Sequence, residues 1–593
     1  MSAYSPEEAG GGDKPERPAK RQRDTLGQTS GRRQAACQTC RLRKVKCDKK
    51  RPQCALCEAS NTSCEYLDDG SEKITLETAT STILKRLDAL HQELSAAKSQ
   101  QSQPLHVPAP PQPSPTQFEP SRDFLRIPPH CASADSILQW PVFNGAYPPN
   151  ALISELFTQN QNGDLITPPT ALVPFDEEQI PLLIDRFLVN VYTKNPILDV
   201  EDLLKSARRC AENGVGWDGA SCLVLMACAL GAVTRPFGTT VQAESSAKLY
   251  AKELQQGDSY FTLACRRLGS LRYSILGAQC YFFAGVYLMY TLRVLHSYHY
   301  FLQASTYTQF CLRTSHGLSD TFAEVITSTD GRRIEQSLYW SCFKSECEFR
   351  VELPLPQSDI SLGEYPQLFP SPPAGSINEE ESWYYYLTEI ALRRIGNRII
   401  NTFFDRRSWH DIRPLLGIAR EFERQVSSWE ANLPPAMQQY ETNSMIRAPY
   451  EAGGHVSREL SWAIDNRLLE MQTWLYQPFL WYLIHVGVER GVDKDLDSLI
   501  QSGIDCSLKT IDVRARGHRH HGLWYDLRSI MSASLTLVVI IKTGNTSWIQ
   551  GGLEAVQPRI HHVVQQFKFW QAEAPDLHRY ITTLKELSHH VRI

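Results

Sequence analysis

Residues 37–64 read CQTCRLRKVKCDKKRPQCALCEASNTSC, and this stretch decides the first folded unit of the chain. It holds six of the 16 cysteines in two similar halves, each with a C-x2-C pair followed by a third cysteine. Thiolates at this spacing are typical ligands of zinc. We therefore expect a metal centre whose ligands are Cys37, Cys40, Cys47, Cys54, Cys57 and Cys64.

The number of thiolates indicates two Zn²⁺ ions that share ligands. A structural zinc takes four ligands, so two separate ions would need about eight thiolates and only six are present. Two thiolates that each bind both ions would complete the two ligand sets. The symmetry of the halves suggests Cys37 and Cys54 for this bridging role. So short a segment has no room for an apolar core and is expected to fold only with metal. A disulfide framework is the alternative, but no apolar signal segment precedes the cluster, which favours a reducing compartment and metal.

The same residues resemble the binuclear zinc cluster of fungal transcription factors. The resemblance covers residues 37–64 and rests on CRLRKVKCD at 40–48, on RPQC at 51–54 and on Pro52 in the loop between the halves. It implies a small zinc-stabilised fold with two short helices, bridged by the first and fourth cysteines. It also implies that the helix between the second and third cysteines reads CGG-type triplets in the major groove.

Charge around the cluster points to double-stranded DNA as the partner. From Lys14 to Arg51 the net charge is +11, whereas the whole chain carries −4, which leaves −15 for the rest. A basic block on an acidic body is typical of DNA binding. Residues 20–23 and 32–33 within the basic block resemble a nuclear import signal, which predicts a nuclear protein, and they could equally belong to an arm that touches DNA.

By the resemblance, Arg43 and Lys44 are the base-reading residues, since Lys and Arg reach guanine O6 and N7. On a helix over residues 38–46, Leu42 and Val45 lie three positions apart and are expected to face inward. The other basic residues are expected to hold phosphates, or simply to offset the charge of the cluster. They are Arg41, Lys46, Lys49, Lys50 and Arg51.

A heptad repeat follows the cluster. Leu76, Ile83, Leu90 and Ala97 share one heptad position, and Thr80, Leu87 and Leu94 share the other. This pattern predicts a short coiled coil over 76–98 that pairs two copies of the chain through residues 76–97, or else an amphipathic helix that packs on the body. The resemblance favours the homodimer. The predicted order is a disordered basic arm (1–33), the zinc cluster domain (34–67), a linker (68–75), the coiled coil (76–98), a mostly disordered Pro-rich linker (99–171) and a helical domain (172–593).

Residues 172–593 are predicted to form a large all-α regulatory domain. Apolar residues recur at helical spacing in many stretches, and strand alternation is absent. About 420 residues is large for a single core, which leaves two lobes open, with the Pro-rich loop 353–375 near their junction. The stretches at 216–232, 334–356 and 475–485 resemble the helical middle domain of the same fungal factors. The resemblance implies regulation through a small-molecule effector, a co-regulator or the transcription machinery.

Four other signals favour structural roles over chemistry. Residues 214–219, GVGWDG, follow a helix-like stretch instead of the strand that a dinucleotide fingerprint needs. Residues 514–521, RARGHRHH, predict a solvated basic loop and not a metal site. The acids and aromatics at 379–386 predict a helix start more than an activation segment. The ten cysteines outside the cluster are expected to be buried thiols and not redox sensors.

Two function classes are disfavoured. The chain contains no P-loop, G-x-S-x-G or H-E-x-x-H motif, so we expect no enzyme, and no apolar run predicts a membrane helix. The sequence predicts a nuclear, sequence-specific transcription factor of the RNA polymerase II type, with control of a specialised metabolic gene cluster as a common role in the resembling family. The alternative is a zinc-dependent protein-interaction module, or a metabolite-sensing regulator, without strict DNA sequence specificity.

Overall fold

The computed structural model divides the chain into two compact units, residues 1–93 and 94–593. The residues it describes are 40, 45–48, 50, 53–60, 132–162, 176–238, 245–315, 329–358, 360, 369–370, 377–404, 409–433, 455–491 and 493–590. The predicted basic arm, the linker 68–75 and the coiled coil at 76–98 lie outside the described residues and stay predictions.

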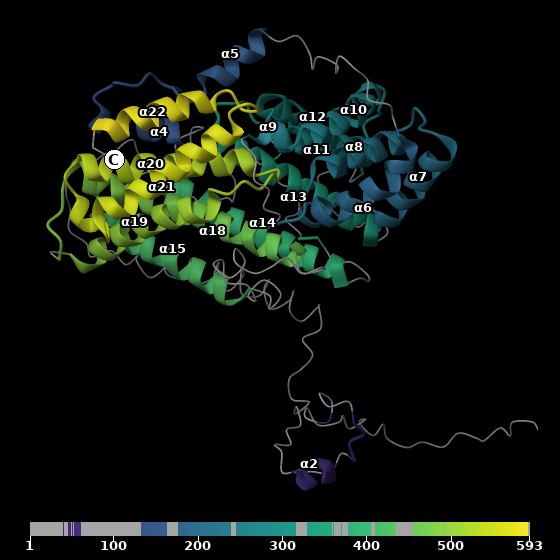
Figure 1. Ribbon diagram of the computed structural model, residues 1–593, viewed down its shortest axis with the longest axis horizontal. Helices are drawn as coiled ribbons and strands as arrows, with labels where there is room; N and C mark the ends of the chain where they lie inside the picture. The colour runs from purple at the N-terminus through teal and green to yellow at the C-terminus, as the bar shows by residue number, and fades with distance from the viewer. Residues whose placement is uncertain are drawn as a thin grey trace, which may run out of the picture. The chain divides into compact units, whose positions relative to one another are not determined.

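The second unit is helical throughout its described part and contains no strand there, which confirms the all-α prediction. Figure 1 shows the arrangement of these helices. In chain order they are α4 (Ala134–Leu138), η1 (Pro141–Phe143), α5 (Ser154–Asn162), η2 (Glu177–Gln179), α6 (Ile180–Asn190), η3 (Tyr192–Lys194), α7 (Val200–Asn213), α8 (Gly219–Val233), α9 (Ser246–Leu249), α10 (Ala251–Leu268), α11 (Ile275–Tyr290), α12 (Val294–Ser315), α13 (Thr329–Glu352), α14 (Ile377–Phe403), α15 (Arg413–Ala431), α18 (His455–His485), α19 (Lys494–Arg514), α20 (Leu523–Lys542), η5 (Thr546–Trp548), α21 (Gly552–Trp570) and α22 (Leu577–His590).

Three helices form the centre of this body. Nearly all residues of α8, α11 and α20 are buried. A helix that is apolar around most of its circumference must be covered on all sides. Helices α6, α7 and α10 pack on α8, helix α12 packs on α11, and α4, α19, α21 and α22 pack on α20. Helix α20 also contacts α11, so the two groups of helices share one hydrophobic core. The two-lobe prediction is therefore wrong for the described residues.

The prediction of a mostly disordered linker over 99–171 is wrong for residues 132–162. Trp140, Phe143, Leu152 and Ile153 are buried in the core. Asp135 in α4 accepts a hydrogen bond from the backbone N–H of Leu152 at 2.8 Å, which closes this segment into a compact turn. Proline and glycine interrupt the apolar residues, so the sequence pattern does not indicate an ordered segment here. The segment is ordered because α20 packs on α4, α18 on η1 and α12 on α5.

The prediction that no apolar run has the length of a membrane helix is wrong for α20. Leu523–Lys542 passes that test, but 89% of its most apolar window is buried inside the body. Its Arg528 is fully buried and pairs with Asp135 and Glu352. The buried surface and the ion pairs indicate a core helix, a type of helix that meets the same length and hydropathy criteria.

Arg514, Arg519 and His520 of the basic histidine stretch 514–521 are buried and its other charged or histidine side chains are half-buried, which overturns the prediction of a solvated loop. The guanidinium of Arg519 is 1% exposed and donates to both carboxylate oxygens of Glu573, at 2.6 and 2.7 Å. It also lies over the rings of Tyr250 and Trp570. Partners more than fifty residues away in the sequence therefore stabilise the charges that local sequence would leave in water.

Two histidines of this stretch, His518 and His520, pair with carboxylates. The Nε2 atom of His518 lies 3.1 Å from Oε1 of Glu459, and Nε2 of His520 lies 3.0 Å from Oδ2 of Asp526. Burial lowers the pKa of His520, although Asp526 opposes this shift. These side chains serve the packing of the loop, and among the described residues they belong to no group with metal-binding geometry.

The other structural expectations are confirmed. Residues 214–218 form the loop between α7 and α8, and 379–386 lie in the first turns of α14. Of the cysteines outside the cluster, the nine that the structure describes are buried or, for Cys265, half-buried. Burial raises the pKa of Cys342 and Cys347 to about 12, so the reactive thiolate is disfavoured at both.

A buried carboxyl gives the helical body a testable pH dependence. Asp576 is 1% exposed, and burial raises its pKa to about 7 even though Arg528 acts in the opposite direction. The carboxylates of Glu155 and Asp135 raise the pKa further. Because the unfolded chain releases this proton near its ordinary pKa of 3.8, the folded state holds the extra proton between pH 4 and 7. The contribution of Asp576 to stability is therefore lost as the pH rises through about 7.

We expect Asp576→Asn to remove this part of the pH dependence, which amounts to at most a few kcal/mol. The amide has no proton to lose, so the variant should gain stability relative to the natural chain at pH 8 and not at pH 4. Urea unfolding at several pH values measures the difference. Asp185→Asn, at an exposed carboxylate on α6, is the matched control. An unchanged pH slope in Asp576→Asn would contradict the assignment.

Candidate metal centre

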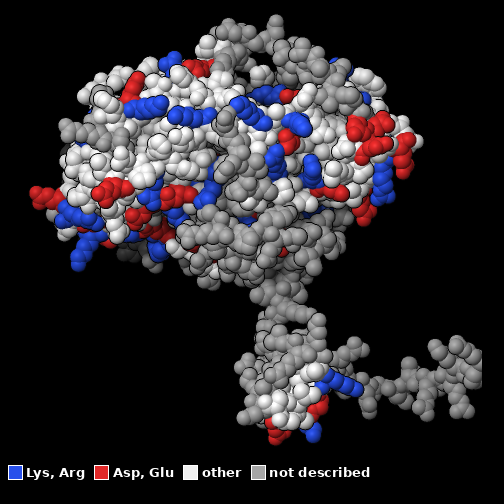
Figure 2. Space-filling view, viewed as in Figure 1, with Lys and Arg blue, Asp and Glu red and all other residues white. Residues whose placement is uncertain are grey.

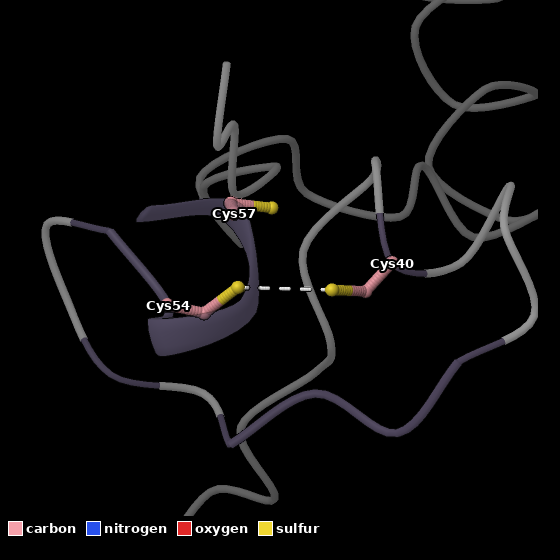
Figure 3. Close-up of side chains that lie close together, drawn as sticks. All are labelled: Cys40, Cys54 and Cys57. Atoms are coloured by element: carbon pink, nitrogen blue, oxygen red, sulfur yellow. Dashed lines mark hydrogen bonds between the residues drawn. The ribbon is translucent and has the colours of Figure 1, made fainter. Parts of the chain in front are cut away.

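The described cysteines of the first unit converge on one point. Figure 3 shows the side chains of Cys40, Cys54 and Cys57 directed toward one another. The sulfurs of Cys40 and Cys54 lie 3.7 Å apart, and the ligand atoms of all three lie within 4.8 Å of one another. All three residues are almost fully buried, although the unit has little apolar surface to bury them in. The sulfurs themselves form the centre of this unit.

A second group of ligand atoms shares one of these cysteines. Cys47, Asp48 and Cys54 also lie within 4.8 Å of one another. Among the described residues, Cys54 is the member common to both groups. This is the geometry expected of a bridging thiolate, because a bridge must approach the ligands of two ions. The bridging role predicted for Cys54 from the ligand count stays a prediction.

Local folding places these sulfurs. Cys54 is the N-cap residue of the short helix α2 (Ala55–Ala59), and the N–H of Glu58 donates to its carbonyl at 3.0 Å. This first helical turn brings the sulfur of Cys57 to the side of Cys54, as the C-x2-C spacing requires. In the first half, the N–H of Val45 donates to the carbonyl of Cys40 at 3.1 Å, which turns the chain back toward Cys47.

The geometry fits zinc and not a disulfide. Two sulfurs on one tetrahedral zinc, with Zn–S bonds of about 2.3 Å, lie about 3.8 Å apart. The 3.7 Å between Cys40 and Cys54 agrees with this value and is far from the roughly 2.05 Å of an S–S bond. The donors are thiols with one carboxylate close by, a set that suits zinc.

Several predicted site residues lie outside the described residues. They are the cysteines Cys37 and Cys64 and the basic residues Arg41, Arg43, Lys44, Lys49 and Arg51. Lys46 and Lys50 are described and both are exposed, as a phosphate contact requires.

The helix predicted over 38–46 does not extend to residue 46. Cys40 is helical, but residues 45–48 are not. Val45 is 40% exposed, so its predicted inward orientation is wrong. Among the described residues of this unit the buried side chains are cysteines, so no described apolar cluster draws Val45 inward.

Sequence reasoning missed one residue of this site. The carboxylate of Asp48 accepts a hydrogen bond from the backbone N–H of Ala55, with donor–acceptor distances of 3.2 and 3.4 Å to its two oxygens. The residue follows Cys47 directly, and an acid beside a metal ligand is a signal that could have drawn attention to it.

Comparisons with known proteins agree with this geometry. The model of the fungal Zn(2)-Cys(6) binuclear cluster domain matches residues 35–73. The chain carries a fungal Zn(2)-Cys(6) binuclear cluster domain. This domain contains all six predicted ligands. The predicted resemblance to the fungal binuclear zinc cluster is therefore confirmed, and zinc binding follows from the matched domain.

A curated relative extends the similarity beyond the Zn(2)-Cys(6) domain. The protein named "Putative transcription factor ecdB" of Aspergillus rugulosus is 24% identical over 448 residues, which cover 72% of this chain and 73% of the relative. An alignment of this length includes much of the helical body. The helical remainder of the chain fits a fungal regulatory domain.

Proposed function

We propose that this protein is a nuclear, DNA-binding transcription factor of the RNA polymerase II type. The observation that carries the proposal is the convergence of the sulfurs of Cys40, Cys54 and Cys57, inside the matched Zn(2)-Cys(6) domain. The net charge of +11 between Lys14 and Arg51 and the name of the relative support it. The same comparisons favour a regulator over an enzyme.

Two Zn²⁺ ions organise the DNA-binding unit in this proposal. Cys37 and Cys54 bridge the ions, and Cys40, Cys47, Cys57 and Cys64 complete the tetrahedral shells. Zinc supplies folding free energy in place of an apolar core and takes no part in a reaction. Six thiolates and two Zn²⁺ leave a net charge of about −2, which the neighbouring lysines offset.

Lysine and arginine side chains then hold the DNA. Lys44 and Arg43 read a CGG-type triplet, and Arg41, Lys46, Lys49, Lys50 and Arg51 hold phosphates. Residues 76–97 pair two chains, which makes the binding site two half-sites. The helical body, with basic and acidic side chains interspersed on the face in Figure 2, tunes the output through a small-molecule effector or a co-regulator. The genes controlled belong to a specialised metabolic cluster.

The roles of the lysines can be separated by salt. Lys44→Ala is expected to cost about 1–3 kcal/mol on the preferred triplet and to relax specificity. Lys50→Ala should weaken all sequences alike and reduce the slope of log K against log salt by about 1. Titrations of cognate and scrambled duplexes at several salt concentrations measure both effects. Lys205→Ala, at an exposed lysine on α7, should change neither. An equal loss of affinity for cognate and scrambled duplexes in Lys44→Ala would indicate that Lys44 contacts phosphates and not bases.

Selection of random duplex DNA by the zinc-loaded full-length protein tests the function. Two enriched CGG-type triplets at one fixed spacing would support a dimeric, sequence-reading factor. Enrichment of a single triplet would support sequence-specific DNA binding but contradict the pairing of two chains through residues 76–97. A folded, zinc-loaded chain that enriches no sequence would overturn the proposal and favour the protein-interaction module or a regulator without strict sequence specificity.

A further inference from the structure

A single carboxylate links the two halves of the cysteine cluster. Asp48 follows Cys47 in the first half, and Ala55 follows Cys54 in the second. The two oxygens of Asp48 lie 3.2 and 3.4 Å from the backbone nitrogen of Ala55. This hydrogen bond therefore spans the loop that contains Pro52 and fixes the distance between two cysteine ligands.

The bond supplies a partner that the helix start needs. The N–H of Ala55 is the first of α2 and has no acceptor within the helix. A residue at the N-cap commonly offers its own side chain to the first turn. Cys54 holds that position, but its sulfur is directed at the sulfurs of Cys40 and Cys57 (Figure 3). Asp48 provides an acceptor from outside the helix and leaves the sulfur of Cys54 to the metal.

We infer that Asp48 is a positioning residue of the zinc cluster, which holds Cys54 in its bridging place through Ala55 and does not bind metal itself. The inference rests on the proposed two-zinc cluster. Asp48 lies within 4.8 Å of the sulfurs of Cys47 and Cys54, so direct ligation is the competing role. Six thiolates with two bridges already fill two tetrahedral shells, and both oxygens of Asp48 face the N–H of Ala55.

Three variants of the full-length chain test this role. Asp48→Ala removes the acceptor, and Asp48→Asn keeps one acceptor oxygen without the charge. The control Glu58→Ala removes an exposed carboxylate from α2, the helix that begins at Ala55. Zinc affinity is measured by competition with a chromophoric chelator. Coordination is measured by the ligand-field absorption of the protein saturated with Co²⁺.

We expect Asp48→Ala to lower zinc affinity about 10- to 100-fold, the usual effect of losing a residue that orients a metal ligand. Asp48→Asn should recover most of this loss, and Glu58→Ala should match the natural chain. At saturation the Co²⁺ spectrum should be the same in all four proteins, because the thiolate ligands are unchanged.

Two results would overturn the inference. An Asp48→Ala affinity equal to that of Glu58→Ala would remove the positioning role. A changed Co²⁺ spectrum in Asp48→Asn would make Asp48 a metal ligand. A natural chain that holds fewer than two zinc ions is a distinct third result, because it would overturn the proposed cluster and, with it, the role of Asp48.

Discussion

Cys54→Ala is expected to abolish both zinc binding and sequence-specific DNA binding. In the proposed cluster Cys54 bridges both ions, so its removal would take a thiolate from each, and Cys54 is the described residue that lies in both groups of ligand atoms. The described residues of this unit contain no buried apolar side chains besides the cysteines to keep it folded without metal. Specific binding should fall to the non-specific level, a loss of about 10³-fold or more. Zinc content by atomic absorption and DNA titration measure the two effects.

Cys57→Ala and Cys265→Ala are the comparisons that make this result specific. Cys57 belongs to one group of ligand atoms, so its loss should weaken one site first and leave close to one zinc per chain. Cys265 lies in α10 of the helical body and should leave the zinc content unchanged. If Cys54→Ala retained as much zinc as Cys57→Ala, the bridging role would be wrong. The same test applies to Cys37, the other predicted bridge.

Arg528→Met is expected to cost the helical body about 3–5 kcal/mol of stability. The guanidinium is fully buried and pairs with Asp135 at 3.0 Å and with Glu352, and it donates to the hydroxyl of Tyr580 at 2.8 Å. Removing one partner of a buried ion pair leaves an uncompensated charge in a medium of low polarity. A loss of this size is a large part of the stability of a typical protein. Urea unfolding monitored by circular dichroism measures it.

The variant should also lose more stability than the natural chain as the pH rises above 4.5, the ordinary pKa of Glu352. Burial already raises the pKa of Glu352, and Arg528 is the main influence that opposes this rise. Arg579→Met is the control, because Arg579 forms a half-exposed pair with Glu155 at 3.0 Å that is worth less than about 1 kcal/mol. Equal losses in the two variants would contradict the role of Arg528. Arg528→Lys, which keeps the charge without the planar fork, should fall between them.

The sequence by itself determined the features that depend on neighbouring residues. The cysteine ligands followed from side-chain chemistry and spacing, since a C-x2-C pair places two sulfurs on one turn. The helices of the body followed from apolar periodicity. The structure adds local caps such as Asp199, whose side chain accepts from Asp202 N–H at the start of α7. The loop at 214–218 and the helix start at 379–386 were predictable for the same reason.

Only the tertiary structure decided the features that depend on distant residues. Asp135 and Arg528 are 393 residues apart, and their pairing helps to bring residues 132–162, expected to be a linker, into the core. Arg519 is buried because Glu573, Tyr250 and Trp570 come to it from other helices. The Asp48 bond exists because the cluster folds one half against the other. The local sequence pattern indicates which secondary structure a segment prefers. The partners that offset a buried charge or cover an apolar side chain come from distant parts of the fold.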